Sequence, residues 1–547
     1  MIKKLTTLDK KETFTFVVLI LSLIWLKEIN FLFYNTQESP DFFKYFVYVE
    51  HFFNGEKTYK DHGLMYYYLQ SINYSVFYGD FANVDLFIHK SIQQVNFYIF
   101  IFGLLGYYQL LRFYEFSNQV IYATMIFVNF FPPSIAMRLI LKPEILAFSL
   151  VPWIIFLIEK FLKSKEIIYL ILAIPLLSSV LTLKGNILGI VCIYLIFTYF
   201  EIFKKLSIRN TIFLLLLLLL GFGLLSFENN SANGKSLIDL QSGSALEESY
   251  DYKAPKSIIY STDLYNLVTS PIKPNHANSF IGVTLLETNG DYFDIYWDND
   301  ASLYFKNRQS VIQFDVKEKI TSPSFNLDTF SVTVFKQRNT DTYLYESIGL
   351  IISIFMYFHL FRNILKSSFL RKYLVFIFVG MAVLLFHSIT GFPKNNFDPL
   401  QGDTFKPVYY SFGLIFSFTF LVALKLKEKF SRFIYIIIYS FIIIFLLGFP
   451  KNYDSQIYTE LVPKIQESTY CDIEKKYFLE NSDFQNLSCD ISEIQISNTL
   501  ERNTLNGGIK HQPVNLSFIV VNILVCLYIF FEKRFIEIIR TDSIVEQ

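Results

Sequence analysis

The stretch NTIFLLLLLLLGFGLLS at residues 210–226 decides the fold class, because it is uninterrupted by any charged residue. A helix needs roughly 20 apolar residues to cross the hydrocarbon core of a bilayer, and windows of about this length recur along the whole chain. The composition agrees, with 52% hydrophobic and only 18% charged residues. The sequence therefore predicts an all-α polytopic membrane protein with about twelve transmembrane helices.

The predicted spans lie at residues 13–34, 94–113, 119–136, 143–161, 167–183, 187–203, 210–226, 344–362, 373–389, 408–425, 433–449 and 515–532. Prolines affect two of them, since proline removes a backbone donor that lipid cannot replace. Pro132 and Pro133 end the third span, and Pro175 lies inside the fifth. The first span follows four lysines and lacks a small-residue cleavage site, which predicts a retained anchor.

Basic residues indicate the orientation, because cytoplasmic connections of membrane proteins carry an excess of Lys and Arg. One set of connections holds Arg112, Lys160, Lys163, Lys165, Lys204, Lys205, Arg209, Arg362, Lys366, Arg371, Lys372, Lys425, Lys427, Lys429, Arg432, Lys533, Arg534 and Arg540. We therefore expect these connections and both termini to be cytoplasmic.

The same rule makes the three large loops extracytoplasmic, and we expect them to include interfacial helices. The resulting division is an N-terminal transmembrane catalytic module at 1–226 with its first outward loop at 35–93, an outward loop or lid at 227–343, transmembrane helices at 344–449, an outward loop at 450–514, and a last helix with a cytoplasmic tail at 515–547.

The four cysteines fit this placement. Cys471 and Cys489 share the third outward loop, where an oxidising compartment would favour a local disulfide. The alternative is that they remain two free thiols. Cys192 and Cys526 fall inside predicted spans.

Several function classes are disfavoured. The formal net charge is zero, and no basic face with interleaved aromatics occurs, so nucleic acid is not an expected partner. No GxGxxG, GxSxG or HExxH motif is present in a suitable context. The sequence NGKS at 233–236 lacks the preceding glycine of a phosphate-binding loop, because that position is Asn229.

The short outward turns carry five basic residues that depart from the positive-inside rule: Arg138, Lys142, Lys184, Lys394 and Lys406. Cations at the outer headgroup level suit the phosphate or diphosphate of a lipid carrier, because charge-assisted bonds to phosphate are strong. The alternative is that they snorkel to bulk phospholipid or pair with acidic neighbours, Glu144, Asp398 and Asp403.

The stretch QESPDFFKYFVYVEHFFNGEKTYKDHGLMYYYL at 37–69 places a carboxylate, Asp41, among aromatics just after the first span. A membrane enzyme could keep a general base there. Alternatively, Ser39, Pro40 and Asp41 cap an interfacial helix that begins at Phe42.

Several segments together carry a resemblance. Asp41 and Tyr45 are followed by FNGEKTY at 53–59 and DHGLMYYYL at 61–69. Further along come LKPEILAFSLVPW at 141–153, LKGN at 183–186 and FKPVYYS at 405–411. These segments resemble the integral membrane glycosyltransferases of fold C (GT-C), which include protein O-mannosyltransferases and lipid A aminoarabinose transferases. The resemblance covers mainly the first 200 residues or so.

The resemblance implies transfer of a sugar, with inversion, from a polyprenyl-phosphate donor to an extracytoplasmic glycan, lipid or protein acceptor. The family's loop carboxylate maps onto Asp41 as general base, Tyr45 and the five outward cations would contact the substrate, and Glu144 or Glu38 would supply a second carboxylate. A second acidic residue directly after the first, common in the family, is absent because Phe42 follows Asp41.

The implied location is a bacterial inner or plasma membrane, and envelope glycan biosynthesis is the implied process. No cofactor is expected. A divalent cation remains an alternative, because GDYFDIYWDND at 290–300 is rich in Asp, but it lacks the spacing of a calcium loop. We expect 227–343 instead to form a folded lid, because loops this long are rarely without structure.

Two other functions remain as alternatives. A polymerase or ligase of the O-antigen type would share the outward loops and cations, but it would carry more arginines in those loops. A secondary transporter would show two matching halves and midplane ionisable residues, whereas here the loops are unequal and the spans nearly free of charge.

Overall fold

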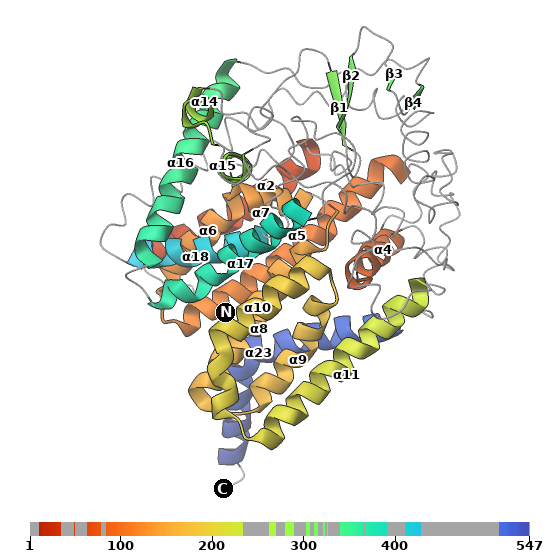
Figure 1. Cartoon of the computed structure of the whole chain (residues 1–547). Helices are drawn as coiled ribbons and strands as arrows, with labels where there is room; N and C mark the ends of the chain where they lie inside the picture. Colours follow the sequence, from red (N-terminus) through yellow and green to blue (C-terminus); the bar gives the residue numbers. More distant parts are fainter. Residues whose placement is uncertain are drawn as a thin grey trace.

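The protein is described from a computed structural model. It describes residues 10–33, 49, 63–77, 84–139, 141–233, 262–269, 279–288, 302–306, 311–315, 321–322, 325–326, 340–364, 368–390, 411–427 and 513–545. These residues are helical apart from short connections and two small antiparallel ladders (Figure 1).

The helices follow the chain as α2 (Lys10–Phe33), α4 (Met65–Phe77), α5 (Val84–Phe113), α6 (Asn118–Phe130), α7 (Pro132–Leu139), α8 (Glu144–Ser164), α9 (Ile168–Leu181), α10 (Gly185–Lys205), α11 (Ile208–Asn233), α14 (Leu264–Thr269), α15 (Phe280–Thr288), α16 (Thr340–Ile364), α17 (Ser368–Thr390), α18 (Ser411–Lys427) and α23 (Pro513–Val545). The strands are β1 (Ser302–Lys306) paired with β2 (Val311–Asp315), and β3 (Thr321–Ser322) paired with β4 (Phe325–Asn326).

The lengths and apolar surfaces of the helices agree with the prediction of a membrane protein. Within the described residues, four are long and apolar enough to cross a bilayer: Ser91–Phe113, Glu144–Ser164, Ile208–Asn229 and Pro513–Phe530. On α11, large apolar side chains such as Leu216, Leu219 and Phe227 are 60–65% exposed in the bundle, as expected for a surface that faces lipid. The total of about twelve spans and the side on which the termini lie remain predictions.

Helices occupy the predicted spans except for two, 119–136 and 433–449. The predicted span 433–449 lies outside the described residues. The single span predicted at 119–136 is wrong, because the chain breaks there into α6 and α7. Phe131 between them is extended, with φ −66° and ψ 122°, since a residue before proline is disfavoured in the helical region. Pro132 then opens α7, where its missing N–H costs nothing.

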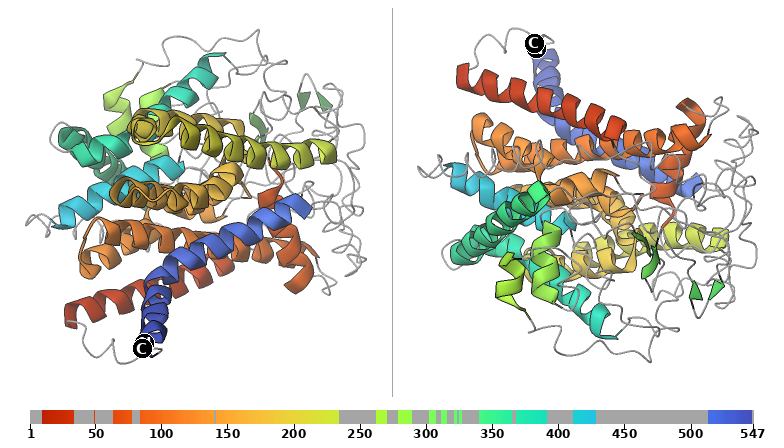
Figure 2. Two further views of the ribbon diagram at one scale, coloured as in Figure 1. Left: turned by 90° about the horizontal axis from the view of Figure 1, so that it is seen from below. Right: turned by 90° about the horizontal axis from the view of Figure 1, so that it is seen from above.

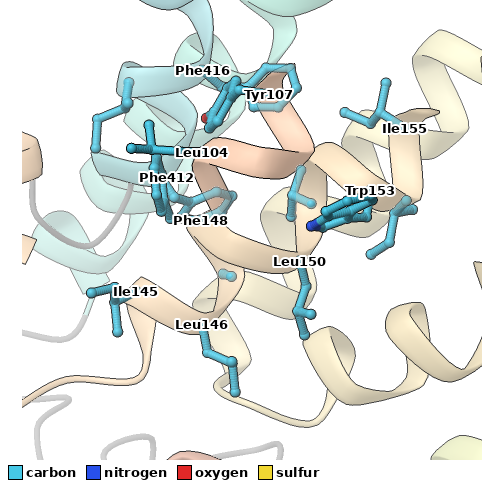
Figure 3. Packing of buried hydrophobic residues seen from close by; sticks show 14 of the residues in the cluster. Leu104, Tyr107, Ile145, Leu146, Phe148, Leu150, Trp153, Ile155, Phe412 and Phe416 are labelled. Carbon is cyan, nitrogen blue, oxygen red and sulfur yellow. The ribbon is translucent and has the colours of Figure 1, made fainter. Parts of the chain in front are cut away.

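The core is built around α8, whose side chains are buried over most of its length (Figure 3). Helix α5 packs directly on it because two glycines leave room. A Cβ on Gly103 would lie 2.7 Å from the Phe148 ring, and one on Gly106 would lie 2.8 Å from Trp153 Nε1. That indole nitrogen donates a hydrogen bond to the carbonyl of Phe102 at 3.1 Å. The close packing of α5 on α8 therefore fixes the positions of the residues at the ends of these two helices.

Part of the predicted lid is folded. Helices α14 and α15 lie beside α16 (Figure 1). Leu267, Leu286 and Leu350 from these three helices form a small buried cluster of their own. The hydroxyls of Thr288 and Tyr357 are 3.1 Å apart and join α15 to α16. The loop at 227–343 thus contains structure that packs on the next long helix.

Contacts at one end of the bundle join the helix ends that the sequence assigns to the cytoplasm. Asn118 Nδ2 at the start of α6 donates to Glu12 Oε1 at the start of α2. Glu159 near the end of α8 pairs with Lys372 at the start of α17 and accepts a hydrogen bond from the Tyr199 hydroxyl at 2.9 Å.

Hydrogen bonds also join helix ends at the opposite end of the bundle, which the sequence assigns to the extracytoplasmic side. Gly63 N donates to Leu183 O at 2.8 Å, which joins the segment before α4 to the turn after α9. Glu228 in α11 accepts hydrogen bonds from the backbone and side-chain nitrogens of Asn515 at the start of α23, at 2.6 and 2.7 Å. The long helices lie side by side (Figure 2), and these contacts gather the helix ends that they join at two distinct ends of the bundle.

This arrangement gives a test of sidedness. A phosphatase reporter fused near Ser244, Asn395 or Gln485 should be active, because these positions follow helix ends of the predicted extracytoplasmic side. Fusions near Ser367 or Glu428 should be silent. An active fusion near Ser367 would reverse the predicted orientation.

Candidate functional site

The starts of three helices come together at the end of the bundle that we expect to face outward. The segment before α4 lies against the turn between α9 and α10, where Gly63 N bonds to Leu183 O. The contact is so close that a Cβ on Gly63 would lie 2.1 Å from the carbonyl oxygen of Thr182. Only glycine fits at this position.

This contact yields a stability prediction. Gly63→Ala should lower the free energy of unfolding by about 1–3 kcal/mol, because the methyl group must displace main chain rather than a flexible side chain. Gly223→Ala is the matched control, since a Cβ at Gly223 meets nothing within 4 Å and alanine favours a helix. Thermal unfolding of the two purified variants measures the difference. Equal midpoints would show that the close approach does not constrain the site.

Helices α8 and α10 both begin here without a side-chain cap. Pro143 precedes α8 and Lys184 precedes α10, and neither makes a side-chain hydrogen bond to the first turn. The first N–H groups of a helix lack partners within it and carry a partial positive charge. Each helix start therefore adds positive potential to the site.

Two of the sequence-predicted residues form an ion pair across these helix starts. Lys184 Nζ lies 2.8 Å from Glu144 Oε1, and the two side chains are 13% and 0% exposed. Glu144 Oε2 is buried and has no hydrogen-bond partner among the described residues. The pair thus links the N-terminal ends of α8 and α10 and uses one of the two carboxylate oxygens.

Arg138 at the end of α7 is buried, with 2% exposure. Its Nη2 donates to the carbonyl of Asn129 at 2.8 Å, and its Cζ lies 4.4 Å from the centre of the Phe100 ring. Nε and Nη1 have no hydrogen-bond partner among the described residues. Burial lowers the pKa of Arg138 to about 9, so the guanidinium keeps its charge at neutral pH.

Lys142 lies between Arg138 and Glu144 in the chain and is also buried, with 1% exposure. A snorkelling lysine would keep its ammonium group at the surface. Burial argues against snorkelling for Lys142 and Arg138, whereas Lys184 does pair with Glu144 as the alternative allowed. Binding of a substrate by these residues stays a prediction.

A network of neutral side chains holds this corner together. Asn96 Oδ1 on α5 accepts hydrogen bonds from the Tyr66 hydroxyl at 2.8 Å and from Gln70 Nε2 at 3.0 Å, both on α4. Asn96 Nδ2 donates to the carbonyl of Arg138 at 3.0 Å. Burial raises the pKa of Tyr66, so its hydroxyl stays protonated and can donate. One asparagine thus joins α4, α5 and α7 beside the cations.

Sequence reasoning missed Tyr66, Gln70 and Asn96 as members of the site. Tyr66 lay inside the quoted segment at 61–69, and Asn96 is a strongly polar residue within a predicted span. A polar side chain in an apolar helix requires a partner, which is the signal that could have indicated Asn96.

Of the predicted site residues, Glu144 and Lys184 are in contact, and Arg138 and Lys142 are buried in α7 and in the short connection before α8. The other predicted residues, Asp41, Tyr45, Lys394, Lys406, Cys471 and Cys489, and the alternative carboxylate Glu38, lie outside the described residues. In the described part of the chain, no group of three or more His, Cys, Asp or Glu side chains could hold a metal ion. Cys192 and Cys526 are free thiols in α10 and α23.

The chemistry of this corner favours an oxyanion. Three cations and one carboxylate lie near two uncapped helix starts in surroundings that exclude most water. Low local dielectric strengthens charge-assisted hydrogen bonds, and planar guanidinium donors suit phosphate oxygens. Donors of this chemistry suit a phosphate group.

Comparisons with known proteins give no relative. No family model matches the chain, and neither the curated proteins nor the solved structures contain a match.

Proposed function

We propose that the protein is a membrane glycosyltransferase that moves a sugar from a polyprenyl-phosphate donor to an acceptor hydroxyl on the outer side of the membrane. The observation that carries the proposal is the burial of Arg138, Lys142 and the Lys184–Glu144 pair around the start of α8, in a bundle whose described part has apolar helices long enough to cross a membrane. A lipid-linked phosphate would place its headgroup at this depth and its chain along the bundle.

In this reaction, the acceptor oxygen attacks the anomeric carbon from the face opposite the phosphate. The bond from that carbon to the phosphate oxygen breaks, and its electron pair stays on the leaving polyprenyl phosphate. Asp41 takes the proton of the acceptor hydroxyl. Arg138, Lys142 and Lys184 stabilise the charge that develops on the phosphate, where fixed cations contribute most.

The described residues support the cation part of this scheme through position and burial. Arg138 is fixed by Asn129 and by the Phe100 ring, and the main chain at Arg138 is fixed by Asn96. Preorganised donors lose little entropy when the anion arrives. A transporter would need no such fixed donors at one membrane surface, because its site must alternate between two sides.

The proposal is tested by searching for the donor. Mass spectrometry of lipid extracts should detect a polyprenyl-phosphate sugar that accumulates in cells lacking the protein and copurifies with it. The purified protein should then move the sugar to an acceptor in vitro. If cells lacking the protein accumulate no lipid-linked sugar, and the purified protein carries none, the proposed function fails.

A further inference from the structure

Helix α4 is attached to α5 by polar side chains. Tyr66 and Gln70 both donate hydrogen bonds to Asn96 Oδ1, at 2.8 and 3.0 Å. Further along α4, Asn73 Nδ2 donates to the hydroxyl of Ser91 at 2.9 Å. The three donor residues are buried, and their spacing of four and three residues places them on one face of α4. These hydrogen bonds therefore fix the position of α4 on α5.

Helix α4 also holds one point of the loop that precedes it. The Ser71 hydroxyl lies 3.1 Å from the carbonyl oxygen of Val49 and 2.9 Å from that of Tyr67, so it donates to both. Val49 is 2% exposed and belongs to the hydrophobic core. Val49 follows Asp41 by eight positions in the chain. The loop that carries the proposed general base is thus attached to α4 at Val49.

Beyond Asn96, the hydrogen bonds continue into the broken helix formed by α6 and α7. The carbonyl of Asn129 would ordinarily accept from the N–H four residues later, but that residue is Pro133, which has no N–H. Arg138 Nη2 donates to this carbonyl instead, at 2.8 Å. The carbonyl of Arg138 lies in the last turn of α7, where helical partners are missing, and Asn96 Nδ2 donates to it at 3.0 Å. Side chains thus replace absent main-chain donors at both helix ends.

Asn96 is the residue at which the bonds from α4 and the bond to α7 meet. Its Oδ1 accepts from α4, and its Nδ2 donates to α7. An amide suits this position because it offers an acceptor oxygen with two lone pairs and an N–H donor on one short side chain. An aspartate would offer no donor. A leucine would offer neither, and it would leave buried polar groups on both neighbouring helices without a partner.

We infer that Asn96 is a positioning residue, which holds Val49, and with it the loop that carries Asp41, in a fixed position relative to Arg138. This inference rests on the proposed function, in which Asp41 takes the acceptor proton while Arg138 stabilises the leaving phosphate. The two groups act on opposite faces of one anomeric carbon. Their relative position therefore affects the rate of transfer more than the affinity for the donor. Asn96 acts through Ser71, α4 and α7 and does not touch the substrate.

The first test compares kinetics of the full-length protein purified in detergent, with the polyprenyl-phosphate sugar isolated from cells that lack the protein as donor. Asn96→Leu should lower kcat by about tenfold, because a displacement of about 1 Å in the reacting geometry is sufficient for such a loss. The donor affinity should stay within about threefold of wild type, because Arg138 keeps its guanidinium.

Asn522→Leu is the matched control. Asn522 is also a buried asparagine in an apolar helix, and its Nδ2 donates to the hydroxyl of Ser179 on α9 at 2.8 Å. This variant should lose stability much as Asn96→Leu does, because it also leaves a buried polar group without a partner. Its kcat should stay within about twofold of wild type. Equal losses of kcat in the two variants would overturn the inference.

A double-mutant cycle tests whether Asn96 acts through Asp41. In the Asp41→Asn background, Asn96→Leu should lower the remaining rate by less than about twofold, because no base is left to misplace. If Asn96 only stabilises the fold, the loss of about tenfold should appear again in this background. That result would overturn the inference.

Hydrogen exchange followed by mass spectrometry gives a readout that needs no substrate. Asn96→Leu should speed exchange in peptides that contain Val49 and in α7, because both depend on the bonds of Asn96, whereas Asn522→Leu should speed it in neither. A protein that transfers no sugar but shows this pattern would support the connection between Val49 and α7 and lose the proposed function. A protein that transfers sugar while Asn96→Leu changes exchange in neither segment would overturn the inference.

Two milder variants keep the test decisive if Asn96→Leu does not fold. Tyr66→Phe removes one of the two bonds to Asn96 Oδ1, and Ser71→Ala removes the bond to Val49. Each should lower kcat by about threefold at unchanged donor affinity, and neither loss should appear together with Asp41→Asn. Wild-type kcat in both variants would overturn the inference.

Discussion

Asp41→Asn should reduce sugar transfer by about a hundredfold to ten-thousandfold, the usual effect of removing a general base. The amide has the shape of the carboxylate and can still cap a helix, but it cannot accept a proton. The substitution therefore separates the two interpretations of Asp41. Transfer is measured with purified protein and excess lipid-linked donor, so that the rate reports the chemical step.

Expression and donor binding should remain nearly unchanged in this variant, because the proton acceptor is not required to hold the phosphate. Asp80→Asn in the same outward loop is the matched control and should retain activity, because Asp80 is not among the candidate bases. Retention of more than a tenth of wild-type turnover by the Asp41 variant would make Asp41 a helix cap. The general base would then have to be sought among the other acidic residues of the predicted outward side, Glu38, Glu50, Asp61 and Glu144.

The helical framework could be predicted from the sequence because apolar windows of bilayer length leave few alternatives. Pro132 and Pro133 indicated that the third span ends near Phe131, but the sequence did not show that residues 132–139 would form a separate helix, α7. Proline indicates where a helix ends and not how the next one packs. The corrected boundary matters, because Arg138 lies on α7.

The basic residues of the candidate site could be identified from the sequence because charged residues are rare among the predicted spans and their short connections. Arg138, Lys142 and Lys184 each departed from the rule that orients membrane helices, and alternating helices bring connections on one side together. Their partners were harder to predict. Tyr66 and Asn96 are uncharged, so they violate no such rule, and their contact joins residues 30 positions apart. Which acidic residue pairs with which lysine depends on packing distances that the sequence does not contain.

The second large effect concerns Arg138, whose guanidinium has two donor atoms without hydrogen-bond partners among the described residues. Arg138→Lys keeps the positive charge but loses the planar fork, so it should weaken binding of the lipid-phosphate donor by about ten- to a hundredfold. Among alanine variants of the five outward cations, we expect Arg138 and Lys406 to show the largest losses. Uniformly mild losses across all five would indicate bulk-lipid anchors and favour a transporter.

Arg112→Lys provides the control for the change of cation, because Arg112 also lies over an aromatic ring, with its Cζ 5.5 Å from the centre of Tyr108. Arg112 is exposed and lies in the last turn of α5, at the opposite end of the bundle. Donor affinity, measured by titration of the purified proteins, should be unchanged in this variant. Since burial of Arg138 makes some loss of stability inevitable, the unfolding midpoint of each variant is measured without donor as well. If Arg138→Lys binds donor within about threefold of wild type, bidentate recognition by Arg138 is excluded. The phosphate would then depend on Lys142 and Lys184 as point charges.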